Sequence, residues 1–549
     1  MNSTAIDLSS SATNPLEIDL LGSGRLPALP SAWLRGDDRD LLRPLNFLVP
    51  DEPLPDPMPA KDRRALADAL AVANAAYGHP AAEAMAERLA DPETQVVVTG
   101  QQAGLWGGPL LGLSKLLATL RWVEALEAAG RKAVAVFWVA TEDHDFRETA
   151  QTVLLGRDGV ENLSLGDDPA PLMPVGMRTF GPNLDALDAQ AAELLSGTAP
   201  GLAWVQRWYR PNARFGEAFS RLMVSLLGER APLMLDSMLP EVKRQEQPWM
   251  RRLVEERGAV DSTFQAREAE IVDRGYELQV APQPNTSPLF LLRGNERRRI
   301  AWTDDGTGYF LRGLEDDVRP VDELLTILDE NPSVVSPGVL ARPAMQDAML
   351  GTAIQVLGPS ETTYMSQVSA IYPLLGLDPP SSALRPQLMV LEARQVEYLN
   401  ELGVTLPELL GGDIDKLLTE KLGGDIVQPI RERIEAALED LHGPVVGLDQ
   451  SLEKPLRKTR DHMIRGLDQL AGRVAAATAR KNDTWKRRLE QIHQSVEPKG
   501  FQERTLPVLH FLNRFGPEVG HAILAQLDLD PRCLRALQLD PAPGNWGDL

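Results

Sequence analysis

A glycine-rich stretch at residues 99–115, TGQQAGLWGGPLLGLSK, contains the first residues whose types and spacing could perform chemistry. It follows a short β-branched run and precedes an amphipathic segment, which is where α/β enzymes hold phosphate or carboxylate groups. The glycines fall at 100, 104, 107 and 108, so the stretch matches neither the dinucleotide fingerprint nor the phosphate-binding P-loop. A simple strand-to-helix joint is the alternative, although such turns favour Asn, Asp and Ser over the Gln101 and Gln102 found here.

A run of ionisable residues, TEDHDFRE at 141–148, follows the apolar segment 133–140. His144 or Asp143 could remove a proton from an attacking group, and Asp145 could hold the imidazole. The run could equally begin a helix, with Thr141 as its cap and acidic residues in the first turn. Histidine beside carboxylates also suits a divalent cation. The other histidines show no ligand spacing, so we expect no tightly bound metal.

Two further polar clusters accompany these stretches. Gly358 to Glu361 come at the end of the apolar run TAIQVLGP, and Arg342 lies in ARPAMQD, where an ion-pair role is the alternative. Ligands of open parallel sheets bind outside the carboxyl ends of the strands. The sequence therefore predicts one pocket, in which the loop at 100–108 cradles an anion and Lys115 or Arg342 offsets its charge. The expected catalytic residues are Lys115, Asp143, His144 and Asp145, and the expected binding residues are Gly100, Gln101, Gln102, Gly107, Gly108, Pro109, Glu142, Arg342, Gln346, Gly358, Glu361 and Tyr364.

A parallel sheet must position these residues. Segments 94–99 and 133–140 have strand character, and the segment between them has the Pro109 start and Gly130 end of a helix. Strand, helix and strand with short joints form a βαβ unit with parallel strands. Further strands are expected at 232–236 and 352–359, a Pro- and Asp-rich insertion at 155–210, and a β-meander at 276–312.

The sequence after Pro386 becomes helical. Apolar residues recur with a period of eleven at Met463, Val474, Trp485 and Val496, which suits a nearly straight coiled coil. One helix over 456–496 would be roughly 60 Å long, and segment 427–443 can supply an antiparallel partner. A hairpin arm and dimerisation explain this pattern equally well.

The composition argues against several classes of function. The 549 residues carry a formal net charge of −22, which repels phosphate backbones, so no nucleic acid partner is expected. No apolar run approaches the ~18 residues that span a bilayer, so no membrane association is expected. Cys533 is the single cysteine, so an intramolecular disulfide is impossible and a cytoplasmic location is expected.

The stretches TGQQAGLWGGPLLGLSK and FWVATEDHDFRE resemble the BshC family, the bacillithiol biosynthesis cysteine-adding enzymes and cysteine ligases. LARPAMQD, VLGPSETTYMSQ and EPKGFQERTLPVLHFLNRFGPE extend the resemblance from about residue 90 to 518. The loop departs mildly from the family, which more often has an aromatic residue followed by Thr-Gly-Pro, and a Tyr before the lysine. These departures concern the shape of the pocket.

The resemblance implies an α/β fold with a Rossmann-like parallel-sheet core, connecting insertions and a long C-terminal coiled coil through which a homodimer forms. It also implies that cysteine is joined to the amine of glucosaminyl malate by an amide bond. A carboxylate does not acylate an amine unaided, so nucleotide binding is expected, with ATP and Mg as the activator. The H-x-G-H and K-M-S-K-S motifs of adenylate-forming class I ligases are absent from the sequence, which leaves adenylate and phosphate chemistry both open.

The expected organisation divides the chain into eight segments. Residues 1–90 form a lead-in with helices, 91–155, 216–250 and 333–386 the core, 156–215 and 251–332 the insertions, 387–500 the coiled coil and 501–549 the tail. Two alternatives to the ligase remain: a metal-assisted amidase or hydrolase of an amino-sugar conjugate, and a non-catalytic, metabolite-binding coiled-coil protein.

Overall fold

The computed structural model describes residues 16–38, 41, 45–48, 53–156, 159–195, 199–423 and 427–542. Residues 1–15 of the expected lead-in lie outside this set. The chain divides into two compact units: the larger contains Asp19–Met389 and Gly500–Leu549, and the smaller contains Val390–Lys499. None of the described helices is long and apolar enough to cross a membrane.

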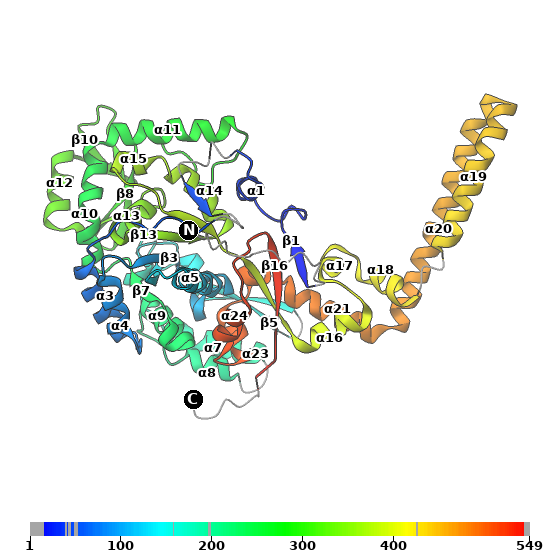
Figure 1. Cartoon of the computed structure of the whole chain (residues 1–549), viewed down its shortest axis with the longest axis horizontal. Helices are drawn as coiled ribbons and strands as arrows, with labels where there is room; N and C mark the ends of the chain where they lie inside the picture. Colours follow the sequence, from blue (N-terminus) through cyan, green and yellow to red (C-terminus); the bar gives the residue numbers. More distant parts are fainter. Residues whose placement is uncertain are drawn as a thin grey trace. The chain divides into compact units, whose positions relative to one another are not determined.

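A six-stranded parallel sheet forms the core of the larger unit (Figure 1). Its strands, in spatial order, are β2 (Asn46–Leu48), β14 (Ser381–Leu384), β13 (Thr352–Leu357), β3 (Gln95–Gln101), β4 (Ala133–Val139) and β7 (Leu233–Asp236). Every neighbouring pair is parallel, which confirms the predicted fold class. The four expected strands all belong to this sheet, whereas β2 has only three residues and β14, with the sequence SSAL, lacks an apolar run.

Helix α5 (Leu110–Ala128) joins β3 to β4 and is covered on more than one side. It packs on both strands and also contacts α22 (Gln502–Thr505) and α24 (Val519–Gln526) of the C-terminal segment. A helix covered in this way is apolar around most of its circumference, so the expected amphipathic pattern is wrong for this segment. Pro109 is the residue before the helix and not its first residue.

Both expected insertions contain regular structure. The first holds the antiparallel pair β5 (Gln151–Gly156) and β6 (Gly159–Ser164), followed by α7 (Asn183–Leu195) and α8 (Pro200–Val205). Helix α9 (Phe215–Leu227) then leads to β7. Helix α10 (Pro240–Glu255) begins in the expected core segment 216–250 and ends in the second insertion, which continues with α11 (Arg257–Asp273).

The expected β-meander is confirmed and is larger than the sequence indicated. It is an antiparallel sheet in the order β11 (Leu314–Pro320), β10 (Gly308–Leu311), β9 (Glu296–Trp302), β8 (Thr286–Arg293) and β12 (Val335–Pro337). The remaining elements of the larger unit are α1 (Ala28–Arg35), α3 (Arg64–Ala76), α4 (Ala82–Ala90), α6 (Phe146–Ala150), α12 (Val321–Glu330), α13 (Arg342–Leu350), α14 (Pro359–Val368), α15 (Ile371–Leu375), α23 (Val508–Phe515) and β16 (Cys533–Leu539).

The smaller unit is helical, although strand β15 (Gln387–Glu392) precedes its first helix and was not expected. Its helices are α16 (Ala393–Leu402), α17 (Leu406–Gly411), α18 (Ile414–Leu418), α19 (Gln428–Leu448), α20 (Glu453–Lys481) and α21 (Asp483–Val496). Helices α19 and α20 lie side by side as an antiparallel hairpin (Figure 1), with an ion pair of 2.8 Å between Arg431 and Asp468.

The expectation of one helix over 456–496 is wrong. The helix is interrupted at Asn482, whose backbone angles of φ −113° and ψ 36° are not helical. The two parts have different surroundings, because Leu489 and Val496 of α21 are buried whereas Met463 of α20 is 42% exposed. The eleven-residue period therefore spans a packed helix and an exposed one.

Candidate functional site

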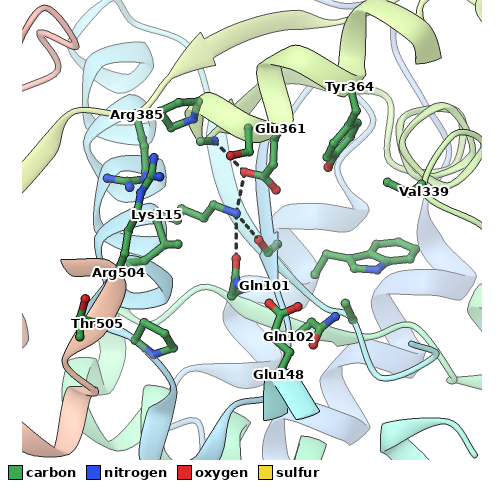
Figure 2. Close-up of a pocket in the computed structure, with 18 of the residues that line it drawn as sticks. Gln101, Gln102, Lys115, Glu148, Val339, Glu361, Tyr364, Arg385, Arg504 and Thr505 are labelled. Atoms are coloured by element: carbon green, nitrogen blue, oxygen red, sulfur yellow. Dashed lines mark hydrogen bonds and ion pairs between the residues drawn. The ribbon is translucent and has the colours of Figure 1, made fainter. Parts of the chain in front are cut away.

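A cavity of about 980 Å³ opens at the carboxyl ends of β3, β4 and β13 (Figure 2). Its walls are the end of β3, the beginning of α14, the β5–β6 hairpin and residues 504–505 of the C-terminal segment. This is the edge at which parallel sheets bind ligands. The predicted residues among its lining are Gly100, Gln101, Gln102, Pro109, Lys115, Arg342, Gly358, Glu361 and Tyr364.

Lys115 lies at the centre of this site and links β3 to α14. Its Nζ donates to the carbonyl oxygen of Gly100 and to Gln101 Oε1, both at 2.9 Å, and pairs with Glu361 Oε2 at 2.6 Å (Figure 2). These three partners use all three ammonium protons. Burial lowers the pKa of Lys115, against the opposing effect of Glu361. The lysine therefore positions the site and has no proton left for a ligand.

Glu361 holds the beginning of α14 as well as the lysine. Its Oε2 accepts a hydrogen bond of 2.7 Å from the backbone N–H of Gly358, so the side chain caps its own helix. A Cβ on Gly358 would lie 3.2 Å from that oxygen and 3.7 Å from Lys115 Cε. The glycine therefore allows the strand end, the lysine and the helix to meet closely.

A fully buried ion pair, missed in the sequence, forms another wall. Arg385 donates from both terminal nitrogens to Glu503, at 2.7 and 2.9 Å, and both side chains are wholly buried. Arg385 Nε is buried and has no hydrogen-bond partner among the described residues. Because Arg385 lines the cavity, this donor is a candidate contact for a bound anion.

The glycine loop is not the open anion cradle that the sequence predicts. The N–H groups of Gly104 and Gly108 donate to Gln102 and Leu105, and that of Gly107 donates to Tyr209 Oη. The first N–H of α5, on Leu110, donates to the carbonyl oxygen of Leu506. These donors are satisfied within the protein, so the loop around Gly107 and Gly108 is a packed strand-to-helix joint.

Close packing explains the glycines of this joint. A Cβ on Gly104 would lie 2.6 Å from Gly108 Cα, and a Cβ on Gly107 would lie 2.8 Å from Val508 Cβ. The buried Trp106 takes a left-handed conformation at φ 48°, which is uncommon for a residue other than glycine.

The TEDHD run lies next to lining residues of the cavity, but none of its own five residues belongs to that lining. Gln102 Nε2 donates to Asp143 Oδ2 at 2.5 Å, while Asp143 Oδ1 accepts from the backbone N–H of His144 at 2.7 Å. Asp145 caps α6 by accepting from the N–H of Glu148 at 3.1 Å. Asp145 therefore does not hold the imidazole, and it performs the capping role that was expected for Thr141.

His144 faces an arginine from the meander. Arg297 Nη1 lies 3.4 Å from His144 Nδ1, and Arg297 is itself stacked on Phe290 at 3.8 Å. Burial, followed by the charge of Arg297, lowers the pKa of His144. A guanidinium can only donate, so the neutral imidazole accepts at Nδ1 and carries its proton on Nε2.

Glu142 and Gln346 lie outside the lining of the main cavity. Glu142 forms a buried ion pair with Lys243, which also pairs with Glu246 Oε2 at 2.6 Å. Burial raises the pKa of Glu142 to about 7, against the opposing charge of Lys243. Gln346 is buried and accepts from Arg342 at 2.7 Å, so it orients an arginine that lines the cavity.

His144 and Asp145 line a second cavity of about 650 Å³, together with residues of α6 and of the segment 164–172. Arg147 and Gln151 line both cavities. Within the described residues, no three His, Cys, Asp or Glu side chains are placed to share a metal ion.

The main cavity is cationic although the chain carries a net charge of −22. Its lining includes the basic residues Lys115, Arg147, Arg342, Arg385 and Arg504 and the acidic residues Glu148 and Glu361. Residues that the sequence did not single out are Trp138, Arg147, Glu148, Gln151, Gln279, Arg385, Arg504 and Thr505. Glu148 and Arg504 lie within the motifs TEDHDFRE and EPKGFQERTLPV, which was the available signal.

The chain is similar to known proteins over nearly its whole length. The family model described as "Bacillithiol biosynthesis BshC, N-terminal Rossmann-like domain" matches residues 55–386. The family model described as "Bacillithiol biosynthesis BshC, C-terminal coiled-coil domain" matches residues 388–529. Proteins named "Putative cysteine ligase BshC" from Salinibacter ruber, Solibacter usitatus and Geobacillus kaustophilus are 32%, 27% and 25% identical to it. The alignments cover 83%, 85% and 92% of this chain and 85%, 88% and 94% of those proteins, respectively.

Proposed function

The chain belongs to the BshC family of bacillithiol biosynthesis, and we propose that it is the ligase that joins cysteine to the amine of glucosaminyl malate. The bond formed is an amide between the cysteine carboxyl carbon and the sugar nitrogen. The observation that carries the proposal is the cationic cavity at the carboxyl ends of β3 and β13. All of its lining residues lie within the two segments that match the family descriptions.

The charge of the cavity suits substrates with several carboxylates or phosphates. Arg342, Arg504 and Arg147 line it, and helix α14 begins at its wall. A helix N-terminus adds a favourable field for an anion. The malate part of the acceptor carries two carboxylates, so these groups would offset its charge where the rest of the acidic surface would repel it.

The reaction needs an activated cysteine carboxyl group, for which we propose ATP with Mg. The orphaned Nε of buried Arg385 and the charge of Arg504, which lines the cavity, fit a phosphate group. Mg²⁺ enters such sites largely through the phosphates and water, so no dedicated set of protein ligands is required. The nucleotide supplies the leaving group, and the chain supplies orientation and charge compensation.

A mass-spectrometric product assay tests this function. Purified protein is incubated with cysteine and glucosaminyl malate, with and without ATP and Mg. We expect a product heavier by one cysteine residue only when the nucleotide is present, together with AMP or ADP. Protein that binds the acceptor but forms no product in any mixture would refute the ligase and favour a metabolite-binding protein.

Two further statements belong to the same proposal. The chain forms a homodimer through the α19–α20 hairpin, which exposes apolar side chains on both helices. It works in the cytoplasm, a location supported by the single Cys533.

A further inference from the structure

The coupling step requires a group that accepts a proton, because an amine attacks only in its neutral form. The sequence offered His144 and Asp143 for this role. The structure gives Asp143 three hydrogen-bond donors: Gln102 and the backbone N–H groups of His144 and Asp145. Arg297 faces His144 Nδ1, which places the imidazole proton on Nε2. Neither residue lines the main cavity.

Among the described residues, only two carboxylates, Glu148 and Glu361, belong to the lining of this cavity. Glu361 is occupied by Lys115 and by the N–H of Gly358. The carboxylate of Glu148 has no hydrogen bond or ion pair to any described residue. In Figure 2 the Glu148 side chain points into the cavity from the wall that faces Lys115 and Glu361.

The backbone of Glu148 is held firmly while its side chain stays open to solvent in the cavity. Its N–H donates to the Asp145 cap of α6, and Phe146 in the same turn is buried against Phe215. A rigid backbone with a free carboxylate is the arrangement that a general base requires.

We propose that Glu148 is the catalytic base of the ligase and accepts the proton of the attacking amine. This inference rests on the proposed function. The acceptor ammonium transfers one proton to the carboxylate, and the nitrogen lone pair then forms the new bond to the activated carboxyl carbon of cysteine. The bond from that carbon to the phosphate oxygen breaks, and the phosphate leaves with the electron pair. The second nitrogen proton passes to water.

The charges around Glu148 tune it for this task. Partial desolvation by the cavity walls raises its pKa to about 7, and the neighbouring Asp145, Asp143 and Glu361 act in the same direction. Lys115 opposes them. The reactive form is the carboxylate, so the base is available above pH 7 and is lost as the pH falls through that value. Catalytic carboxylates are raised to this range because it matches the working pH.

The test compares wild-type protein with Glu148→Gln, which keeps the shape of the side chain but cannot accept the proton. We expect amide formation to fall about 100- to 10,000-fold, within the range for general base catalysis. Activation of cysteine should persist, and it is measured by trapping with hydroxylamine, whose nitrogen is already neutral at pH 7. Glu161→Gln is the matched control, because Glu161 is exposed on β6 and lies outside the cavity lining.

The pH profile separates a base from a structural residue. The wild-type rate should rise through about pH 7, as Glu148 loses its proton. The Glu148→Gln rate should instead recover at higher pH, where the acceptor amine is neutral without assistance. A variant that forms the amide at the wild-type rate, or loses hydroxylamine trapping equally, would overturn the assignment.

A binding measurement distinguishes failure of the Glu148 assignment from failure of the proposed ligase activity. Calorimetric titration with glucosaminyl malate at pH 7 is run in two buffers of different ionisation enthalpy. An ammonium beside Glu148 lowers the pKa of the carboxyl group, so wild type should release a proton on binding and Glu148→Gln should not. Equal release by both proteins, or no binding at all, would overturn the Glu148 contact. Proton release without product in any nucleotide mixture would overturn the ligase alone.

Discussion

Arg297 and His144 illustrate how a residue outside the recognised motifs can set the properties of a residue inside one. Arg297 lies on β9 in the second insertion, more than 150 residues away in sequence, and donates toward His144 Nδ1. Pattern and spacing in the run TEDHD could not reveal that contact. Burial and the charge of Arg297 lower the pKa of His144, and the arginine contact at Nδ1 sets the tautomer. The role expected for His144 therefore changes from proton acceptor to hydrogen-bond donor.

Replacing Arg297 should therefore raise the pKa of His144. In Arg297→Met the imidazole loses a cationic neighbour, so its pKa should move up toward the ordinary value of about 6.5. The shift is measured by NMR titration of the histidine ring protons, with the resonance identified by its loss in His144→Gln. Arg298→Met is the control, because Arg298 pairs with Glu296 instead. An unchanged pKa would contradict the contact.

The Arg385–Glu503 pair yields a prediction about stability. Glu503→Gln removes one charge and leaves a guanidinium that is wholly buried, so the free energy of unfolding of the larger unit should fall by about 3 kcal/mol. Urea unfolding followed by tryptophan fluorescence measures the loss. Glu87→Gln, which breaks an exposed ion pair with Arg64, should leave the midpoint unchanged. Equal losses of unfolding free energy in the two variants would show that the buried pair stabilises the protein no more than the exposed pair does.

The parallel strands β3 and β4 explain why the edge of the sheet that carries the candidate site could be located from sequence. Both are buried on two faces, so their sequences are continuous apolar runs, and the polar residues that follow necessarily lie at one edge of the sheet. The short strands β2 and β14 give no such run. Glu148 and Arg504 could not be placed because the cavity walls depend on how α6 and the C-terminal segment pack.

The glycine loop is an element whose structure could not be predicted from the sequence. Its composition suggested an anion cradle, yet the C-terminal residues Leu506 and Val508 bond to Leu110 and Gly108 and close it. Those residues come about 400 positions later in the chain. Spacing near Gly100 carries no information about such distant residues, so the sequence predicts an open loop where the structure has a packed one.

Close contact between β3 and β4 makes Gly100 a sensitive position. A Cβ there would lie 2.9 Å from the carbonyl oxygen of Trp138, which belongs to the backbone of the neighbouring strand and cannot move cheaply. Gly100→Ala should destabilise the larger unit by about 1–3 kcal/mol. Gly258→Ala on α11 meets nothing within 4 Å and should stabilise it by about 0.5 kcal/mol. Thermal unfolding of both variants measures the two changes in stability. An equal loss of stability in both variants would contradict the prediction.

At the scale of the whole molecule, the side chains of the α19–α20 hairpin are far more exposed to solvent than those in the core of the larger unit. No described residue of α19 is buried. Ile430 and Leu441 of α19 are each 48% exposed, as is Leu470 of α20. Ile430 and Leu441 are eleven residues apart, and Leu441 and Leu448 are seven apart, which keeps all three on one side of the helix. Such a stripe is stable when a second helical surface covers it.

Dimerisation through this stripe is the prediction that concerns the whole chain. Leu441→Glu combined with Leu470→Glu should convert the protein from dimer to monomer, because four carboxylates would be buried in the paired interface. Sedimentation velocity measures the oligomeric state of the variant. Val272→Glu is the control, since Val272 is exposed on α11 of the larger unit and should leave the dimer intact. The monomeric variant should keep the ligase rate, because every residue of the main cavity belongs to the larger unit. A dimer that survives both substitutions would mean that the subunits pair through another surface.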